Sequence, residues 1–281
     1  MPSEYTGSRL KHVSYSELST YRQCPHKHQL AYIERWDKEE AAVPLTRGRI
    51  FHEMLAAHYE ALKLGELERV GVDVVLSDVE DEELADLLSW MYDGYIDHYF
   101  FDAQWGILEV EKKEEIWLPT EDGRRSTYRL KMIIDLLVAD EQGRIWLVDH
   151  KTNADFPNEL GLDLDDQFSL YAWGLTQLGY NVHGVIYNCI RTRRNKGPMA
   201  LDDRFRRVMM YRTPEQLRNT AIDAWRTTRR MRSAEWAERT TNSDTCQWRC
   251  SYTEACLWGR KGGDEREFLT SAGFVPDSEH S

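Results

Sequence analysis

The chain has 281 residues and a net charge of −12, with 41% hydrophobic and 30% charged residues. This length can bury a large core, and the composition is that of a globular chain rather than a disordered one. No run approaches the roughly 18 apolar residues of a membrane span, and the first residues lack the apolar core of a secretory signal. We therefore expect a cytoplasmic protein with no membrane partner.

The acidic total hides an uneven distribution of charge. Arg191 to Arg232 holds thirteen Lys and Arg against four Asp and Glu, whereas Glu66 to Asp86 holds nine acidic residues and one arginine. Because electrostatic fields are screened within about 10 Å at physiological salt, an acidic average does not prevent a local basic groove. The basic run is therefore either a nucleic-acid-binding surface or a solvated helix face.

The first hundred residues carry helical patterns. Ser14 and Glu17 have the spacing of a capping box, so a helix is expected to begin there and to end or break near Pro25. Apolar residues at helical spacing predict a second helix from about residue 46 to 64. Residues 65–81 are expected to form a loop, and residues 82–101 a further helix.

Short β-branched and aromatic runs then replace the helical pattern. Turn sequences separate three of them, which predicts an antiparallel meander over residues 108–118, 127–139 and 144–150. The remaining elements are expected to be a helix, a strand, a strand and a long helix over 165–178, 182–190, 205–211 and 214–237. This order favours an α/β or α+β domain with a mixed sheet.

The turn between the second and third strands sets their register. Asp140 to Arg144 fits a three-residue hairpin loop with Gly143 in the left-handed position, and this register places Asp135 opposite Asp149. Two carboxylates across a ladder lie about 5 Å apart and repel each other, unless a cation neutralises them or one is protonated. A register shifted by one residue would move Asp135 to the other face.

Lys151 lies two residues beyond Asp149 and therefore on the same face of the strand. Two acids and a lysine suit phosphodiester hydrolysis, because the acids hold Mg²⁺ or Mn²⁺ while the lysine helps to orient or deprotonate the attacking water. Without further motifs, the same residues would form only a buried salt bridge.

Three sequence motifs, one of which contains Asp149 and Lys151, occur in order along the chain. Gly48-Arg49-Ile50-Phe51-His52 falls on a predicted helix, LVDHKTN includes Asp149 and Lys151, and Gln167 and Tyr171 lie four apart on the next helix. The set resembles the RecB-like branch of the PD-(D/E)XK nuclease superfamily, whose members show G-x-x-x-H, a strand-ending Asp, D/E-x-K and Q-x-x-x-Y. The resemblance covers residues 48–171. It implies a restriction-endonuclease-like core with a mixed central sheet flanked by helices.

The resemblance also implies a metal site for Mg²⁺ or Mn²⁺. His52, Asp135 and Asp149 would be ligands, and the backbone carbonyl of His150 would complete the shell. An additional acid from residues 109–115 is a further candidate, and the sequence does not choose among these acids.

Three residues would complete the catalytic site by the same resemblance. Lys151 would be the catalytic lysine. Gln167 and Tyr171 share one helix face, and they would line the site and contact DNA or brace the metal ligands. Taken alone, a Gln and Tyr pair at this spacing is typical of a helix surface at the edge of a core.

Four of the five cysteines suggest a second inorganic site. Cys24 lies near the N-terminus and the others follow the pattern C-x3-C-x5-C near the C-terminus, at Cys246, Cys250 and Cys256. In an unexported protein such cysteines are thiols or metal ligands rather than disulfides. Cys189 falls in a predicted strand and is interpreted as a buried small hydrophobe.

One distant N-terminal cysteine followed by three C-terminal ones resembles the iron–sulphur subgroup of these nucleases, which includes AddB-type helicase–nucleases and CRISPR-adaptation nucleases. The resemblance implies a [4Fe–4S] cluster joining the N- and C-terminal regions, although x2 is commoner than x3 in the first gap. Four thiolates also suit zinc. In that alternative, His26 or His28 replaces one cysteine.

We therefore expect a metal-dependent deoxyribonuclease, an exonuclease, acting in DNA recombination, repair or the processing of phage or mobile-element DNA. It would form a single domain over 1–281, with an N-terminal helical region to residue 45, a nuclease core over 46–237 and a cysteine-rich region over 238–281. No G-x-x-x-x-G-K-[ST] sequence is present, so any helicase or recombinase partner would be a separate protein. The DNA would be single-stranded or have single-stranded ends.

Two alternatives remain at this point. One is a catalytically silent DNA-binding or scaffolding module of the same fold, against which the presence of His52, Asp135, Asp149 and Lys151 argues. The other is a site-specific endonuclease of DNA or RNA, for which the chain supplies no recognition domain.

Overall fold

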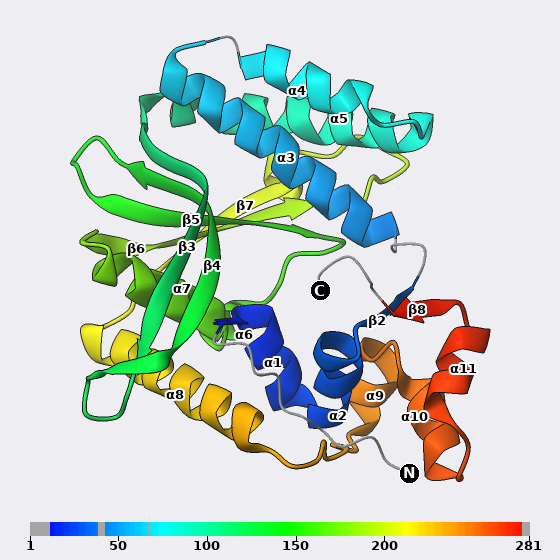
Figure 1. The fold of residues 1–281 in the computed structure, drawn as a ribbon. Coiled ribbons are helices and arrows are strands. Elements are labelled where there is room, and N and C mark those ends of the chain that lie inside the picture. The colour runs from blue at the N-terminus through cyan, green and yellow to red at the C-terminus, as the bar shows by residue number, and fades with distance from the viewer. Residues whose placement is uncertain (1–11, 39–42, 67, 277–281) are drawn as a thin grey trace. The chain divides into compact units, whose positions relative to one another are not determined.

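The computed structural model describes residues 12–38, 43–66 and 68–276 (Figure 1). Contacts between Cα atoms divide the chain into two compact units. We call Ala42–Ile116 with Met132–Thr220 the core unit, and Met1–Ala41, Trp117–Lys131 and Ala221–Ser281 the terminal unit. Among the described residues, no helix combines the length and the apolar character that crossing a bilayer requires.

A mixed sheet organises the core unit. Strand β4 (Arg125–Ala139) pairs with β3 (Gly106–Pro119) and runs antiparallel to β5 (Ile145–Asn153). Strand β5 is parallel to β6 (Val182–Arg191), which is antiparallel to β7 (Phe205–Met210). The mixed α/β architecture expected from the sequence is confirmed. The proposed division into sequence regions remains a prediction.

The β4–β5 hairpin has the register that its turn predicts. Leu136 pairs with Val148 and Ala139 pairs with Ile145, which continues to Asp135 opposite Asp149. Gly143 adopts a φ of 74°, and the Asp140 N–H donates to the Arg144 carbonyl over 3.0 Å. The left-handed turn residue therefore fixes which side chains of the two strands share a face.

The two faces of this sheet pack against different helices. On one face, Leu136, Val148 and Ile186 belong to a core cluster with residues of α3 (Val43–Leu64) and α5 (Glu82–His98). On the other, Phe168 of α7 (Asp166–Gln177) makes an edge-to-face ring contact with Tyr187. Because strand residues alternate between faces, Asp149 and Lys151 lie on the α7 face and His150 on the opposite one.

The prediction of a loop over residues 65–81 is wrong. Residues Glu68–Ser77 form helix α4, which packs along α3. Its valines and Gly71 have weak helix propensity, but Val72 is completely buried and Gly71 comes close to Ala57. Tertiary packing of one apolar face therefore overrides the local preference.

The terminal unit brings together segments from both ends of the chain. Strand β1 (His12–Ser14) lies parallel to residues 129–131 of β4, and Ser14 Oγ caps α1 (Tyr15–Gln23) by accepting from the Glu17 N–H. Helix α2 (Pro25–His28) begins one residue after Cys24, as the proline predicts. Helix α8 (Pro214–Ser233) reaches this unit from residue 221 onward.

Residues after 240, expected only to be polar and cysteine-rich, form three short helices and a strand: α9 (Ser243–Arg249), α10 (Thr253–Arg260), α11 (Glu265–Ser271) and β8 (Phe274–Pro276). Strand β8 pairs antiparallel with β2 (Trp36–Lys38). A small core of Leu30, Tyr252 and Leu269 also joins the two ends. The terminal unit therefore has its own hydrophobic centre.

The β4–β5 turn predicts a dependence of stability on pH. Burial alone would raise the pKa of Asp140, but hydrogen bonds from Trp146 and Arg144 lower it to about 2. A depressed pKa stabilises the fold above the unfolded-state pKa of about 3.8, and this contribution is lost as the pH falls through 2. Asp140→Asn should therefore lower the free energy of unfolding at pH 7, with a difference that shrinks between pH 4 and 2.

Chemical denaturation at several pH values would measure this difference. Glu141→Gln removes an exposed carboxylate of the same turn and serves as the control. A loss that stays constant down to pH 2 would contradict the assigned role of Asp140.

Candidate functional site

Three side chains from three elements of the core unit converge at one end of the sheet. The ligand atoms of His52 on α3, Glu111 on β3 and Asp135 on β4 all lie within 4.8 Å of one another. His52 Nδ1 is 3.6 Å from Asp135 Oδ2. The predicted pairing of a helical histidine with the acid of the second meander strand is therefore present in the fold.

Asp149 and Lys151 lie beside this group on β5. Lys151 Nζ is 2.8 Å from Asp149 Oδ2, and the charge of Asp135 acts on both residues. Asp149 is 4% exposed, so this ion pair lies away from solvent. Two buried acids thus share a single ammonium group.

Helix α7 presents the two predicted helical residues to the same face. Lys151 Nζ donates to Gln167 Oε1 over 3.4 Å. Tyr171 is buried, hydrogen-bonds to the backbone of Ile133, and is close enough for the charges of Asp149 and Lys151 to act on its hydroxyl. Asp165 caps the helix at the Gln167 N–H and so fixes where it begins.

His150 contributes its backbone to this site. Its N–H donates to Asp135 Oδ2 over 2.8 Å, and its backbone hydrogen-bonds to the His52 ring. Its side chain points to the other face of the sheet, where the ring is buried and Asn188 Nδ2 lies 2.8 Å from Nδ1. Only the main chain of His150 is therefore available to a metal, as the resemblance implies.

The four predicted cluster cysteines line one cavity of the terminal unit. Cys24, Cys246, Cys250 and Cys256 surround a space of about 240 Å³, although more than 200 residues separate the first from the others. The Lys27 N–H donates to Cys24 Sγ over 3.5 Å. Cys189 belongs to the other unit and is buried in β6, as its sequence context predicts.

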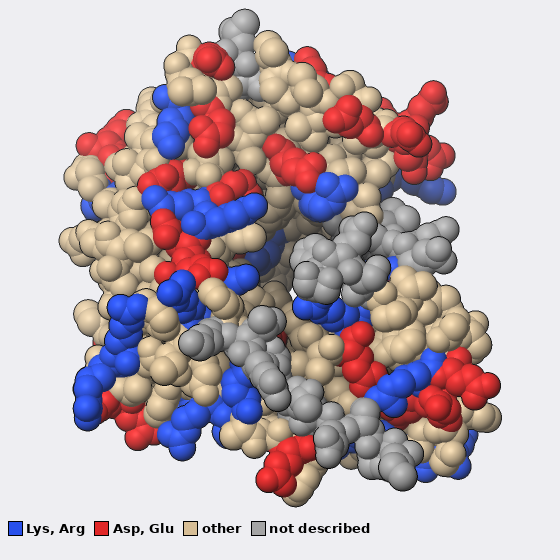
Figure 2. Space-filling model, viewed as in Figure 1, with Lys and Arg blue, Asp and Glu red and all other residues tan. Residues whose placement is uncertain are grey.

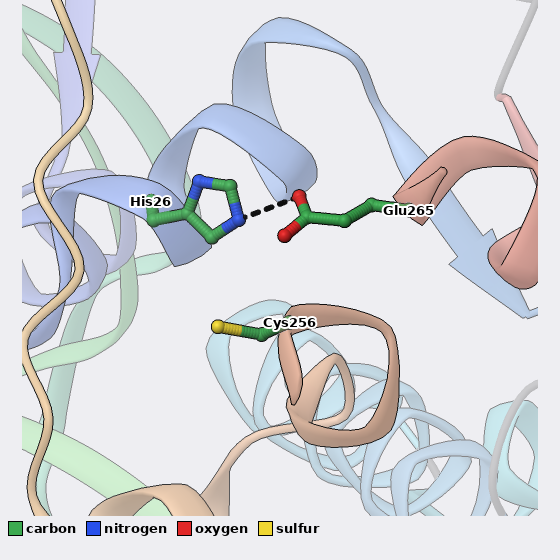
Figure 3. A group of neighbouring side chains, drawn as sticks. All are labelled: His26, Cys256 and Glu265. Atoms are coloured by element: carbon green, nitrogen blue, oxygen red, sulfur yellow. Dashed lines mark ion pairs between the residues drawn. The ribbon is translucent and has the colours of Figure 1, made fainter. Parts of the chain in front are cut away.

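A polar group adjoins this cavity at Cys256 (Figure 3). His26 Nε2 lies 2.9 Å from Glu265 Oε2, and Arg239 lies 2.6 Å from the other oxygen of Glu265. Burial alone would raise the pKa of Glu265, but hydrogen bonds from His26 and Arg239 lower it. The Arg239 side chain also hydrogen-bonds to Cys256, so an arginine already supplies positive charge beside this thiol.

Comparison with known proteins identifies the family of this chain. The model of the PD-(D/E)XK nuclease superfamily matches residues 12–257, which is most of the chain. The chain belongs to the PD-(D/E)XK nuclease superfamily. No curated protein matches it.

A search of solved structures found two matches for this PD-(D/E)XK protein that cover most of the chain. A candidate exonuclease from Eubacterium rectale has a TM-score of 0.53 at 12% identity, with 87% of this chain and 91% of that chain covered. The protein SSO0001 has a TM-score of 0.43 at 11% identity, with 88% and 86% covered. At these identities, the first likeness concerns the fold alone.

The electrostatics of the acidic site suit a divalent cation. Burial and the neighbouring charge of Asp135 raise the pKa of Asp149 to about 7 despite Lys151, and they raise the pKa of Glu111 to about 7 as well. Burial also lowers the pKa of His52, which favours the neutral imidazole that metals bind. Crowded carboxylates and a neutral histidine are a donor set that fits Mg²⁺ or Mn²⁺.

Sequence reasoning named a range for the additional acid, and the structure selects Glu111 from it. Glu109 instead accepts from Lys112 and Tyr180, away from the metal-site group. Glu111 has a φ of 44°, a left-handed conformation that non-glycine residues rarely adopt. Such backbone outliers concentrate at functional sites, but periodicity along a strand gives no sign of them.

The arginine-rich segment does not form a continuous basic face. Many of its arginines bind nearby carboxylates of their own unit, as in the pairs Arg191–Asp155, Arg194–Asp86, Arg212–Asp163 and Arg226–Glu121. Figure 2 likewise shows basic and acidic side chains next to each other on the visible face. Much of the local positive charge is therefore balanced by nearby carboxylates, most of which are exposed.

The raised pKa of Glu111 predicts a stability change that depends on pH. A carboxyl whose pKa is raised keeps its proton longer in the folded chain, so stability falls as the pH rises from about 4.5 through 7. Without metal at pH 8, Glu111→Gln should therefore be more stable than the wild type by about 1–2 kcal/mol, allowing for solvent screening. Near pH 4 the two should be equal.

Thermal unfolding with chelator and with Mn²⁺ would measure this effect. Mn²⁺ should stabilise the wild type more than the variant. The control is Glu109→Gln on the same strand. Hydrogen bonds from Lys112 and Tyr180 lower the pKa of Glu109, so removing this carboxylate should lower the free energy of unfolding at pH 8. Stabilisation by both substitutions would contradict a specific role for Glu111.

Proposed function

We propose that the protein is a metal-dependent deoxyribonuclease that acts as an exonuclease. The observation that carries this proposal is the convergence of His52, Asp135, Asp149 and Lys151 at one end of the sheet, with two buried acids facing one ammonium group. A catalytically silent module has no use for such crowding, because it lowers stability without a cation. Membership of the nuclease superfamily supports the same conclusion.

The metal would be held by the acidic group. His52, Asp135, Asp149 and the His150 carbonyl are the ligands predicted from the sequence, and Glu111 joins them by its position. A bound Mg²⁺ or Mn²⁺ would polarise the scissile phosphate and acidify a water molecule. The buried carboxylates hold this cation in a site of low polarity, where its charge is least screened.

The lysine and its helix partners would position the reacting groups. Aspartate raises the pKa of Lys151 despite its burial, so this side chain stays an ammonium that can orient the water and offset charge on the phosphate. Gln167 accepts from Lys151 and restricts the direction in which the amine points. Tyr171 packs against the same acids and would brace them or contact DNA.

One arginine of the basic segment is well placed to bind the DNA backbone. Cys189 pairs with Lys151 on one side and with Arg206 on the other, so Arg206 shares the face of the catalytic lysine two strands away, about 10 Å. Arg206 is exposed, and its guanidinium lies over the ring of Phe156, 4.6 Å from the ring centroid. It would hold a phosphate that flanks the scissile one.

The cysteine cavity would hold a [4Fe–4S] cluster with a structural role. All four cysteines line this one cavity, which supports a site with four thiolate ligands. The ligand atoms of His26 and Cys256 lie with those of Glu265 within 4.8 Å of one another, so a zinc site in which His26 replaces one cysteine is the alternative. Such a cluster would join the chain's two ends and close a long loop.

The proposed biological setting is DNA processing beside a motor or recombination protein. A helicase or recombinase would be the partner, because the sequence contains no G-x-x-x-x-G-K-[ST] motif. Its substrate would be DNA that is single-stranded or has single-stranded ends, in recombination, repair or the processing of phage or mobile-element DNA.

Cleavage of end-labelled DNA tests the activity. The wild type should cleave with Mg²⁺ or Mn²⁺ and not with chelator, whereas Asp149→Ala and Lys151→Ala should each lose at least about 100-fold in rate. Glu60→Gln, an exposed acid on the helix that carries His52, is the matched control and should retain activity. Equal cleavage by the wild type and both alanine variants would point to a contaminant and end the proposal.

Binding of a catalytically inactive protein to single-stranded DNA tests the role of Arg206. In an Asp149→Ala background, Arg206→Gln should weaken binding and reduce the slope of affinity against salt by about one. Arg218→Gln removes an exposed arginine of the same segment that lies on α8, outside this row. Equal losses in both variants would favour a diffuse basic surface instead.

Metal analysis of protein purified without oxygen tests the cluster. Iron and sulphide should be present in about equal amounts with a brown colour, and Cys250→Ser should lose the colour and lower the melting temperature. Cys189→Ser should keep the colour. One zinc ion per chain with no colour would select the zinc alternative.

A further inference from the structure

The structure contains a second ordered row of side chains directly behind the catalytic one. Lys151, Cys189 and Arg206 lie on the α7 face of strands β5, β6 and β7. The neighbouring row, His150, Asn188 and Arg207, occupies the same three strands on the α3–α5 face. All three are buried or nearly so, and no role in cleavage requires polar groups there.

This second row forms an unbroken chain of hydrogen bonds. Asp102 binds Arg207 through both carboxylate oxygens, at 2.6 and 2.5 Å. Arg207 Nε donates to Asn188 Oδ1 over 3.3 Å, and Asn188 Nδ2 lies 2.8 Å from His150 Nδ1. The link between Asn188 and His150 is buried and the links of Arg207 are partly buried, so breaking the first would leave a desolvated polar group without a partner.

The direction of these bonds fixes the chemistry at each end. Arg207 can only donate, so the Asn188 oxygen must face it and the Asn188 amide nitrogen must face His150. His150 Nδ1 is then the acceptor, which places the ring proton of the neutral imidazole on Nε2. The arginine therefore determines both the orientation of an amide and the tautomer of a histidine on the adjacent strands.

The same network reaches the helix that carries His52. Tyr59 lies two helical turns after His52 on α3, and its hydroxyl donates to Asp102 Oδ2 over 2.6 Å. Its ring stacks on the His150 ring with centroids 5.8 Å apart and an angle of 11°. Tyr95 of α5 accepts from Asn188 over 2.8 Å and from Arg207 over 3.1 Å. The network thus holds α3 and β5 in one arrangement.

We propose that Asn188 and Arg207 are positioning residues that set the metal site through His150. This inference rests on the proposed function, because it concerns the same site. The main chain of His150 binds Asp135 through its N–H and lies between Asp149 and Lys151. Because the His150 ring is anchored on the opposite face, the peptide units on either side of His150 cannot rotate, and the side chains of Asp149 and Lys151 keep their directions. Partners of this kind typically change metal affinity or activity by about 10–100-fold.

A pair of substitutions tests the proposal. Asn188→Leu keeps a similar side-chain volume and removes the hydrogen bond to His150 Nδ1. The affinity for Mn²⁺, measured from the electron paramagnetic resonance signal of the free ion, should fall about 10–100-fold. The control is Tyr92→Phe, which removes an equally buried hydroxyl 3.0 Å from the ring of His58 on the same α3–α5 face, away from β5. It should lose stability and keep the Mn²⁺ affinity.

The rate constants separate positioning from simple destabilisation. With saturating Mn²⁺, Asn188→Leu should keep its KM for DNA and show a kcat at least about 10-fold lower, because the backbone contacts of the substrate are untouched. Tyr95→Phe removes one partner of Asn188 and should show a smaller change in the same direction. Equal Mn²⁺ affinity in Asn188→Leu and the wild type would overturn the proposal.

A measurement on the wild type makes the test independent of whether the variants fold. Nitrogen NMR of ¹⁵N-histidine-labelled protein should show His150 with its proton on Nε2, with the signal assigned by its absence in His150→Gln. A proton on Nδ1 would overturn the proposal. If the wild type binds Mn²⁺ and shows the expected tautomer but cleaves no DNA, the proposed function fails while the positioning role stands.

Discussion

Repulsion between buried carboxylates is the constraint on which the core unit depends. Asp135 and Asp149 share one face of the β4–β5 hairpin, Glu111 adds a third acid, and Lys151 supplies the nearby ammonium. An apolar fold gains nothing from such a group, since each buried charge without a partner lowers stability. The surrounding elements are therefore best understood as a frame that keeps these acids together, as the proposed cation site requires.

Successive side chains of β5 point to opposite faces of the sheet, and the two faces have different roles. Alternate residues place Asp149 and Lys151 toward α7, where Gln167 and Tyr171 restrict them. The residue between them turns its ring the other way, into a network that also reaches α3. A single strand thus connects the proposed catalytic groups on one face with a hydrogen-bond network on the other, through the backbone between them.

Much of the site could be predicted because its determinants are local. The turn at Gly143 fixed the register, and the alternation of the strand then placed Asp149 and Lys151 together. Helix α4 was missed because long-range packing overrode weak propensity, and Glu111 was not selected because a left-handed residue breaks the strand pattern. The hydrogen bonds of Asn188 join strands and helices that are far apart in sequence, so no local sequence pattern predicts them.

The backbone of Glu111 has a consequence for how the sequence can change. A left-handed φ of 44° is unfavourable for any side-chain-bearing residue except asparagine or aspartate, and glycine adopts it freely. Selection for folding alone would therefore favour glycine at this position, whereas selection for a carboxylate opposes it. In a relative that does not use the proposed metal site, we therefore expect glycine or asparagine at the position of Glu111.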